Sequence, residues 1–158
     1  MVTVNYATSY NNDLLNGGSV LLELAVLAAR GSAAAQRVID GETIDDADKQ
    51  SLSQISKLFR TSAANVNSYV QQRPSTEPLF GSLAATVDVA IDAISHDAVE
   101  GLDVSALEEA LNANASRVEA FISNPSAGTA SPLVILLANL LSAVLRETGH
   151  IGETALTI

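Results

Sequence analysis

The feature that most constrains the fold of this chain is an apolar run over residues 132–145, with the sequence PLVILLANLLSAVL. Only Asn139 and Ser142 interrupt it, so a helix here is apolar on every side. Such a helix is either a membrane span or the central helix of a bundle. A span needs about 20 apolar residues, and this run stops at the charged residues Arg146 and Glu147. We therefore predict a central buried helix and no membrane span.

Local signals predict where this helix and a similar one begin and end. Ser131 is a suitable N-cap and Pro132 suits the first helical position, while Gly149 favours termination. A second segment, apolar nearly all round, follows the N-cap candidate Ser19. We expect Gly31 to break or kink that second helix.

Three amphipathic segments lie between these two helices. The first is capped by Thr43 and stopped by Pro74, the second runs from Pro78 to Gly101, and the third is capped by Asp103. Their apolar residues recur every three or four positions, as in helices with one buried face. The stripes are Leu52, Ile55, Phe59, Val66, Tyr69 and Val70; Phe80, Leu83, Val87, Ile91, Ile94 and Ala98; and Leu107, Leu111, Val118, Phe121 and Ile122.

These elements predict an all-α, single-domain bundle of five to six helices, since 158 residues suffice for one core. We assign residues 1–18 to an extended arm, 19–149 to the bundle and 150–158 to a tail. The sequence from Leu107 to Leu145 also repeats the pattern of the sequence from Ile55 to Ile91. Val66 and Tyr69 match Val118 and Phe121, and a proline follows each pair a few residues later. The echo suggests a duplicated helical hairpin.

Composition excludes several functions. The chain has no cysteine and a net charge of −10, which rules out disulfides and thiol chemistry and disfavours nucleic-acid binding. The charge is uneven, because residues 75–158 carry eleven acids and two bases while residues 1–74 carry seven and six. Residues 1–18 have no basic segment of a signal peptide, so we expect a cytoplasmic protein.

An acidic row is the strongest candidate for chemistry. Asp88, Asp92, His96 and Glu100 follow one another at four-residue spacing, and an Asp and a His one turn apart can share a metal or act as an acid–base pair. The row drifts away from the apolar stripe toward solvent. We therefore interpret Asp88, Asp92 and Glu100 as a solvated acidic face and expect no catalytic, metal or cofactor site.

Two other patterns fail as metal sites. Glu147 and His150 have the spacing used by di-iron bundles, but no second such pair exists. The acidic run over residues 40–48 lacks the glycine and the oxygen positions of a calcium loop.

A basic face gives the clearest hint of binding. Lys49, Lys57 and Arg60 lie on one side of their predicted helix, which has no acid between Lys49 and Arg73. This face either packs on an acidic helix of the same chain or meets the acidic half of another copy.

We expect a non-enzymatic interaction or self-assembling protein that binds its own copies or another protein. One alternative is a bundle that holds a small apolar ligand or pigment between its two most apolar helices. A second is an acidic decoy that blocks a basic surface of a partner, and a third is an enzyme that uses His96 with Asp92. No motif of a known family is evident.

Overall fold

The computed structural model describes residues 2–72, 82–94 and 103–157, with side-chain positions for residues 20–68, 86–94 and 103–147. Its five helices confirm the all-α prediction. They are α1 (Val2–Ile39), α2 (Asp46–Gln72), α3 (Ser82–Ile94), α4 (Val104–Ser123) and α5 (Ala127–Thr157).

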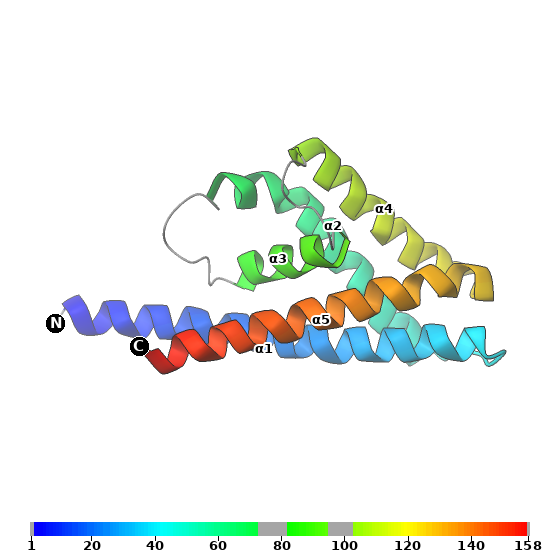
Figure 1. Ribbon diagram of the computed structural model, residues 1–158, viewed down its shortest axis with the longest axis horizontal. Helices are drawn as coiled ribbons and strands as arrows, with labels where there is room; N and C mark the ends of the chain where they lie inside the picture. Colours follow the sequence, from blue (N-terminus) through cyan, green and yellow to red (C-terminus); the bar gives the residue numbers. More distant parts are fainter. Residues whose placement is uncertain (1, 73–81, 95–102, 158) are drawn as a thin grey trace.

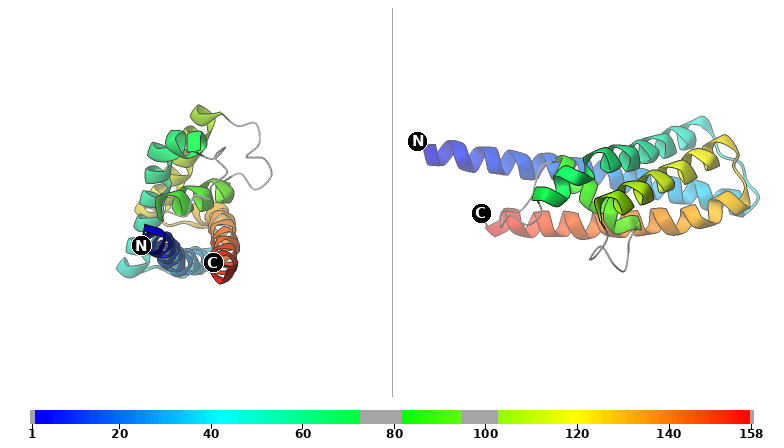
Figure 2. Two further views of the ribbon diagram at one scale, coloured as in Figure 1. Left: turned by 90° about the vertical axis from the view of Figure 1, so that its left-hand side faces the viewer. Right: turned by 90° about the horizontal axis from the view of Figure 1, so that it is seen from above.

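The helices form two pairs with α3 between them. The first helix, α1, packs mainly on α5 and runs antiparallel to it, while α2 packs mainly on α4 (Figure 1). Viewed along their length, α1 and α5 lie side by side on one side of the bundle, and α3 and α4 lie on the opposite side, while α2 starts beside the end of α1 and crosses toward α4 (Figure 2). The short helix α3 contacts all four others, so it links the two pairs.

The core consists of the stripes expected from the sequence. In α2 the buried residues include Leu52, Ile55, Phe59 and Val66. Leu107, Leu111, Val118 and Phe121 are buried in α4, and Val87 and Ile91 in α3. Helical periodicity identified these buried residues correctly because each of the three helices has one apolar side and one polar side. Tyr69, Val70, Phe80, Leu83 and Ala98 lie outside the residues whose side chains are described.

Two helix ends follow the capping rules closely. The Asp103 carboxylate accepts a hydrogen bond of 2.7 Å from the Ala106 amide at the start of α4, as predicted. At the end of α1, Gly41 has a φ of +87°, and Glu42 N–H donates to the Arg37 carbonyl at 2.8 Å. Gly41 N–H also donates to the Val38 carbonyl at 3.1 Å, and these two hydrogen bonds around a left-handed glycine form a Schellman motif.

At the start of α2 the cap differs from the one expected. We predicted Thr43, but α2 begins at Asp46 and the cap is Asp45. The Asp48 amide donates to Asp45 Oδ1 at 2.9 Å, and the Asp45 amide donates to Asp48 Oδ2 at 3.2 Å. This reciprocal pair is a capping box with aspartate in both places.

Gly31 does not break α1, contrary to the prediction. The helix continues through it, and Gly31 is buried. A Cβ atom added to Gly31 would lie 3.0 Å from both Leu137 Cδ1 and Leu52 Cδ2, and 3.2 Å from Ile55 Cδ1. The glycine therefore serves close packing of α1 on α5 and α2, a use that has the same sequence signal as a break.

The ends of the first and fifth helices are longer than expected. In place of an extended arm over residues 1–18 and a tail over 150–158, α1 is helical from Val2 and α5 continues to Thr157. Nucleation is the costly step of helix formation, and each residue added to an existing helix gains a hydrogen bond. Segments of modest propensity, such as residues 1–18, can therefore extend a helix that the core has already fixed.

The fifth helix also begins earlier than its predicted cap. It starts at Ala127, so Ser131 is inside the helix and Pro132 lies in its second turn. Ser126 is the cap, since its Oγ accepts from the Thr129 amide at 3.3 Å and the Thr129 hydroxyl accepts from the Ser126 amide at 3.1 Å. Only one hydrogen bond, to the Gly128 carbonyl, is lost at the proline.

The apolar run in α5 has two different sides. Leu133, Leu137 and Leu140 are buried, whereas Ile135 and Leu145 are 66% and 59% exposed. The run thus packs into the core with one side and faces outward with the other. The positions matched by the echo between hairpins, such as Val66 and Val118, are both buried, but duplication itself stays a hypothesis.

Candidate interaction surface

The basic face predicted on α2 is partly used inside the molecule. Arg60 Nε and Nη2 donate to the two carboxylate oxygens of Glu119 on α4 at 2.9 and 2.8 Å. Arg60 also donates to Asn112 Oδ1 at 3.1 Å and to Ser116 Oγ at 3.2 Å. Ser56 Oγ donates to the same Glu119 at 2.7 Å. For Arg60, the intramolecular interpretation of the basic face is therefore the one seen.

This cluster changes the acidity of its carboxylate. Hydrogen bonds from Arg60 and then from Ser56 lower the pKa of Glu119 to about 2 from its ordinary 4.5. Glu119 in turn raises the pKa of Arg60. The bidentate geometry fixes the guanidinium plane against α4, so the cluster orients α2 on α4.

The remaining basic residues are less engaged. Lys57 is exposed and Lys49 is half-buried, and neither makes an ion pair with another of the described residues. The predicted face is thus divided between one arginine bound to α4 and two lysines that face solvent to different degrees.

Two further ion pairs join neighbouring helices. Arg37 of α1 lies 2.5 Å from Asp48 at the start of α2, and Arg146 of α5 lies 2.5 Å from Asp92 of α3. Burial alone would raise the pKa of Asp48. Hydrogen bonds from the Arg37 side chain and the Asp45 backbone amide outweigh burial, so the pKa of Asp48 is lower than its ordinary value. The Arg146–Asp92 pair is exposed and the Arg37–Asp48 pair is partly buried. An exposed pair adds little stability, and we interpret both pairs as orienting contacts.

The predicted acidic row is only partly described. Asp88 and Asp92 are half-buried on α3, and Asp92 is the partner of Arg146. Glu100 and His96 lie outside the described residues, as does the side chain of His150. Within the part that the structure describes, no three His, Cys, Asp or Glu residues are grouped to hold a metal.

The large apolar side chains exposed among the described residues all lie on α1 and α5. They are Leu22 (60% exposed), Val26 (51%), Ile135 (66%) and Leu145 (59%). Single exposed hydrophobic residues are common on protein surfaces. Here, all four lie on one helix pair, which makes the outer side of α1 and α5 the most apolar surface among the described residues.

Each of these helices carries an exposed stripe with alternating four- and three-residue spacing. On α1 the stripe is Leu22, Val26, Ala29 and Ala33; on α5 it is Ser131, Ile135, Ala138, Ser142 and Leu145. We call these the α1 stripe and the α5 stripe. Both lie on the side of their helix opposite the buried residues, and neither contains a charge. Any single face of a helix has this spacing; the unusual property of these two faces is that they are exposed and uncharged.

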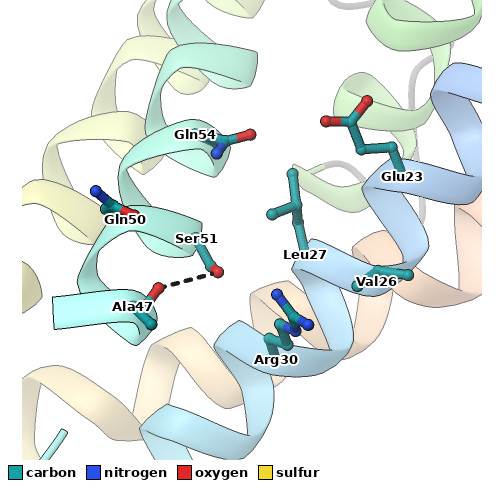
Figure 3. Close-up of a pocket in the computed structure, with 8 residues that line it drawn as sticks. All are labelled: Glu23, Val26, Leu27, Arg30, Ala47, Gln50, Ser51 and Gln54. Carbon is teal, nitrogen blue, oxygen red and sulfur yellow. Dashed lines mark hydrogen bonds between the residues drawn. The ribbon is translucent and has the colours of Figure 1, made fainter. Parts of the chain in front are cut away.

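An open groove borders the α1 stripe on its α2 side (Figure 3). It has a volume of about 370 Å³ and is lined on α1 by Glu23, Val26, Leu27 and Arg30. On α2 the groove is lined by Ala47, Gln50, Ser51 and Gln54, of which Ser51 and Gln54 point toward α1 in Figure 3. The groove thus has an apolar wall at Val26 and Leu27, with opposite charges at its two ends.

The fifth helix is also long and apolar enough to cross a membrane by length and composition alone. Within the 21-residue segment Ala127–Glu147, the most apolar stretch of 18 residues has a mean hydropathy of 1.8, and 39% of that stretch is buried in the bundle. Core helices of soluble proteins can meet the same criterion, so the absence of a membrane span stays a prediction.

Comparison with known proteins adds no assignment. No family model, no curated protein and no solved structure matches the chain. Sequence reasoning also missed the two stripes, although the four–three spacing from Leu22 to Ala33 could have revealed one of them. The apolar residues on every side of both helices concealed the outward face.

Proposed function

We propose that this is a non-enzymatic interaction protein that self-associates through the outward side of α1 and α5. The observation that carries the proposal is the exposure of Leu22, Val26, Ile135 and Leu145 on two adjacent helices. Fully burying an exposed side chain of this size is favourable by about 1.5–3 kcal/mol, and each of these four still exposes 51–66% of its surface. Large exposed apolar patches mark interaction sites, and these four side chains are gathered on one helix pair.

The contacts between α2 and α4 also favour an interface on α1 and α5. Arg60 is engaged with Glu119 inside the chain, so it has less capacity to bind another copy than the sequence suggested. We therefore propose the α1 and α5 stripes as the main interface, with Lys49 and Lys57 outside it.

The other functional hypotheses have less support. A ligand between α1 and α5 would need space near their contact, but at Gly31 the packing is so close that an added methyl group would have to displace Leu137 slightly. An acidic decoy surface would depend on Asp88, Asp92 and Glu100, and Asp92 is already paired with Arg146. Neither observation favours these hypotheses over self-association.

The test is the mass of the protein in solution, measured by light scattering behind size exclusion at several concentrations. We expect masses above the 16.4 kDa of one chain. Replacing Leu22 and Ile135 together with serine should return the mass toward that of one chain.

Lys57→Glu is the matched control for this experiment. Association through apolar stripes should be unaffected by Lys57→Glu, whereas association through the basic face should be lost. A mass of one chain at every concentration would contradict the proposal.

A further inference from the structure

We infer that the α1 stripe binds the α1 stripe of a second copy, antiparallel, about a twofold axis that passes at the level of Leu27 and Ala28. The inference rests on the proposed function, because it specifies the partner and its orientation. It is carried by two independent patterns along α1, one of size and one of charge.

The size pattern favours an antiparallel arrangement. Along the α1 stripe the large residues Leu22 and Val26 come first, and the small residues Ala29 and Ala33 follow. Antiparallel pairing places Leu22 opposite Ala33 of the second copy and Val26 opposite its Ala29. Facing helices pack best when large side chains meet small ones. Parallel pairing would set leucine against leucine and leave a gap between the alanines.

The charge pattern favours the same arrangement. Glu23 and Arg30 are exposed and flank the α1 stripe on its α2 side, at the two ends of the groove in Figure 3. They are seven residues apart, about 10 Å along the helix, and neither makes an ion pair with another described residue. Flanking charges of this kind set the orientation of paired helices.

A twofold axis between these two residues makes the charges self-complementary. Glu23 of each copy then lies beside Arg30 of the other, so that two ion pairs form across one interface. In a parallel pair, by contrast, Glu23 would face Glu23 and Arg30 would face Arg30. An interface that uses the same patch on both subunits is the usual basis of closed dimers, and the open groove beside α2 gives both side chains room.

The α5 stripe extends this contact. If the twofold axis is directed from α1 toward α5, its main neighbour (Figure 2), the second copy sets its own α5 against this α5. Ile135 and Leu145 become covered, while Ala138 and Ser142 allow the helices to approach closely. Stable interfaces bury about 1,600 Å² in total, which two helices per subunit can supply more readily than one.

Charge reversal of the full-length protein tests the pairing. Glu23→Arg alone and Arg30→Glu alone each place like charges together twice, and we expect each to weaken the dimer about tenfold or more. The double variant carrying both reversals should recover the wild-type mass. Equimolar mixing of the two single variants should also restore a dimer, because each supplies the charge that the other needs.

Cysteine cross-linking tests the direction of the helices, since the natural chain has no cysteine. Leu22→Cys mixed with Ala33→Cys should form a disulfide-linked dimer under mild oxidation. Leu22→Cys alone should not, because two copies of residue 22 would be about 16 Å apart along antiparallel helices, beyond the reach of a disulfide. Circular dichroism checks that every variant keeps its helices.

The outcomes separate this inference from the proposed function. If the wild-type protein associates but neither single reversal weakens it, or if Leu22→Cys links to itself, the antiparallel α1 pairing is wrong and the apolar interface stands. If the wild-type protein remains a single chain at all concentrations, both are wrong. Binding of that single chain to neutral phosphatidylcholine vesicles would then identify lipid as the occupant.

Discussion

The two helix pairs of this bundle differ in how their outer surfaces are finished. Between α2 and α4, Arg60 binds Glu119, Asn112 and Ser116 across the outer edge of the pair. The α1 and α5 pair is packed closely at Gly31, yet it exposes Leu22, Val26, Ile135 and Leu145. Among the described residues, large apolar side chains are exposed on the second pair alone.

This difference teaches that close packing inside a helix pair and a complete polar exterior are separate properties. On the α2 and α4 surface, Arg60 and Glu119 pair within the chain, and the exposed Lys57 is a charge that water can solvate. The α1 and α5 surface gains free energy only when something covers it. The following predictions test this contrast, from the largest expected effect to the smallest.

Truncating a buried side chain of α2, in the α2 and α4 pair, should have the largest effect on stability. Phe59 is fully buried between α2 and its neighbours, so Phe59→Ala should lower the free energy of unfolding by about 3–5 kcal/mol. Urea denaturation followed by circular dichroism measures it. A loss below about 1 kcal/mol would mean that the α2 and α4 core is much looser than described.

The close contact at Gly31, in the α1 and α5 pair, should be nearly as sensitive to substitution. Gly31→Val places a branched side chain where even a Cβ lies 3.0 Å from Leu137 and Leu52, and it should destabilise by about 1–3 kcal/mol. Gly128→Ala is the matched control, because nothing lies within 4 Å of a Cβ there. It should be neutral or stabilise by up to about 1 kcal/mol. Equal unfolding midpoints for Gly31→Val and wild type would contradict the close contact.

The polar cluster should contribute a smaller effect that depends on pH. Glu119 has a pKa of about 2 in the folded protein against an ordinary 4.5, so the folded state favours its ionised form. The stabilisation is therefore complete above pH 4.5 and is lost as the pH falls from 4.5 toward 2.

Urea midpoints at three pH values check this dependence. Glu119→Gln should be less stable than wild type at pH 7, and the two should converge near pH 2. Glu109→Gln, at an exposed acid of the same helix, serves as the control. A constant difference between wild type and Glu119→Gln over this range would contradict the assigned pKa.

Substitution on the open surface should have the smallest effect on the fold. Ile135 is 66% exposed, so Ile135→Ser should change the stability of dilute protein by no more than about 0.5 kcal/mol. At higher concentration the difference from wild type should grow, because association stabilises the folded state by mass action. A large loss that is independent of concentration would show that Ile135 packs within its own chain.

The sequence predicted the helices with one polar side better than those without one. The stripe from Leu52 to Val66 could be assigned because polar residues marked the opposite side. The apolar run in α5 offered no such contrast, and nothing in its composition separates Leu137, which is buried, from Ile135, which is exposed. Which side faces the core depends on the other helices.

Glycine and charge were ambiguous for similar reasons. Gly31 could end a helix or allow two helices to approach, and only the positions of Leu137 and Leu52 decide. The sequence placed Arg60 on a basic face, but its partner Glu119 is 59 residues away and could not be identified by helical spacing. The Asp103 cap was predictable because its hydrogen bond is local.

The pairing of the first helix with the fifth has a consequence for synthesis. The main partner of α1 is α5, the last of the described helices along the chain. During synthesis α1 can therefore pack on α5 only after α5 has left the ribosome. Contacts between distant segments form late, and chains emerge from the N-terminus at about 5–20 residues per second. Until α5 arrives, α1 exposes its core-facing side as well as its stripe, and nascent chains that stop before Ala127 should require chaperones.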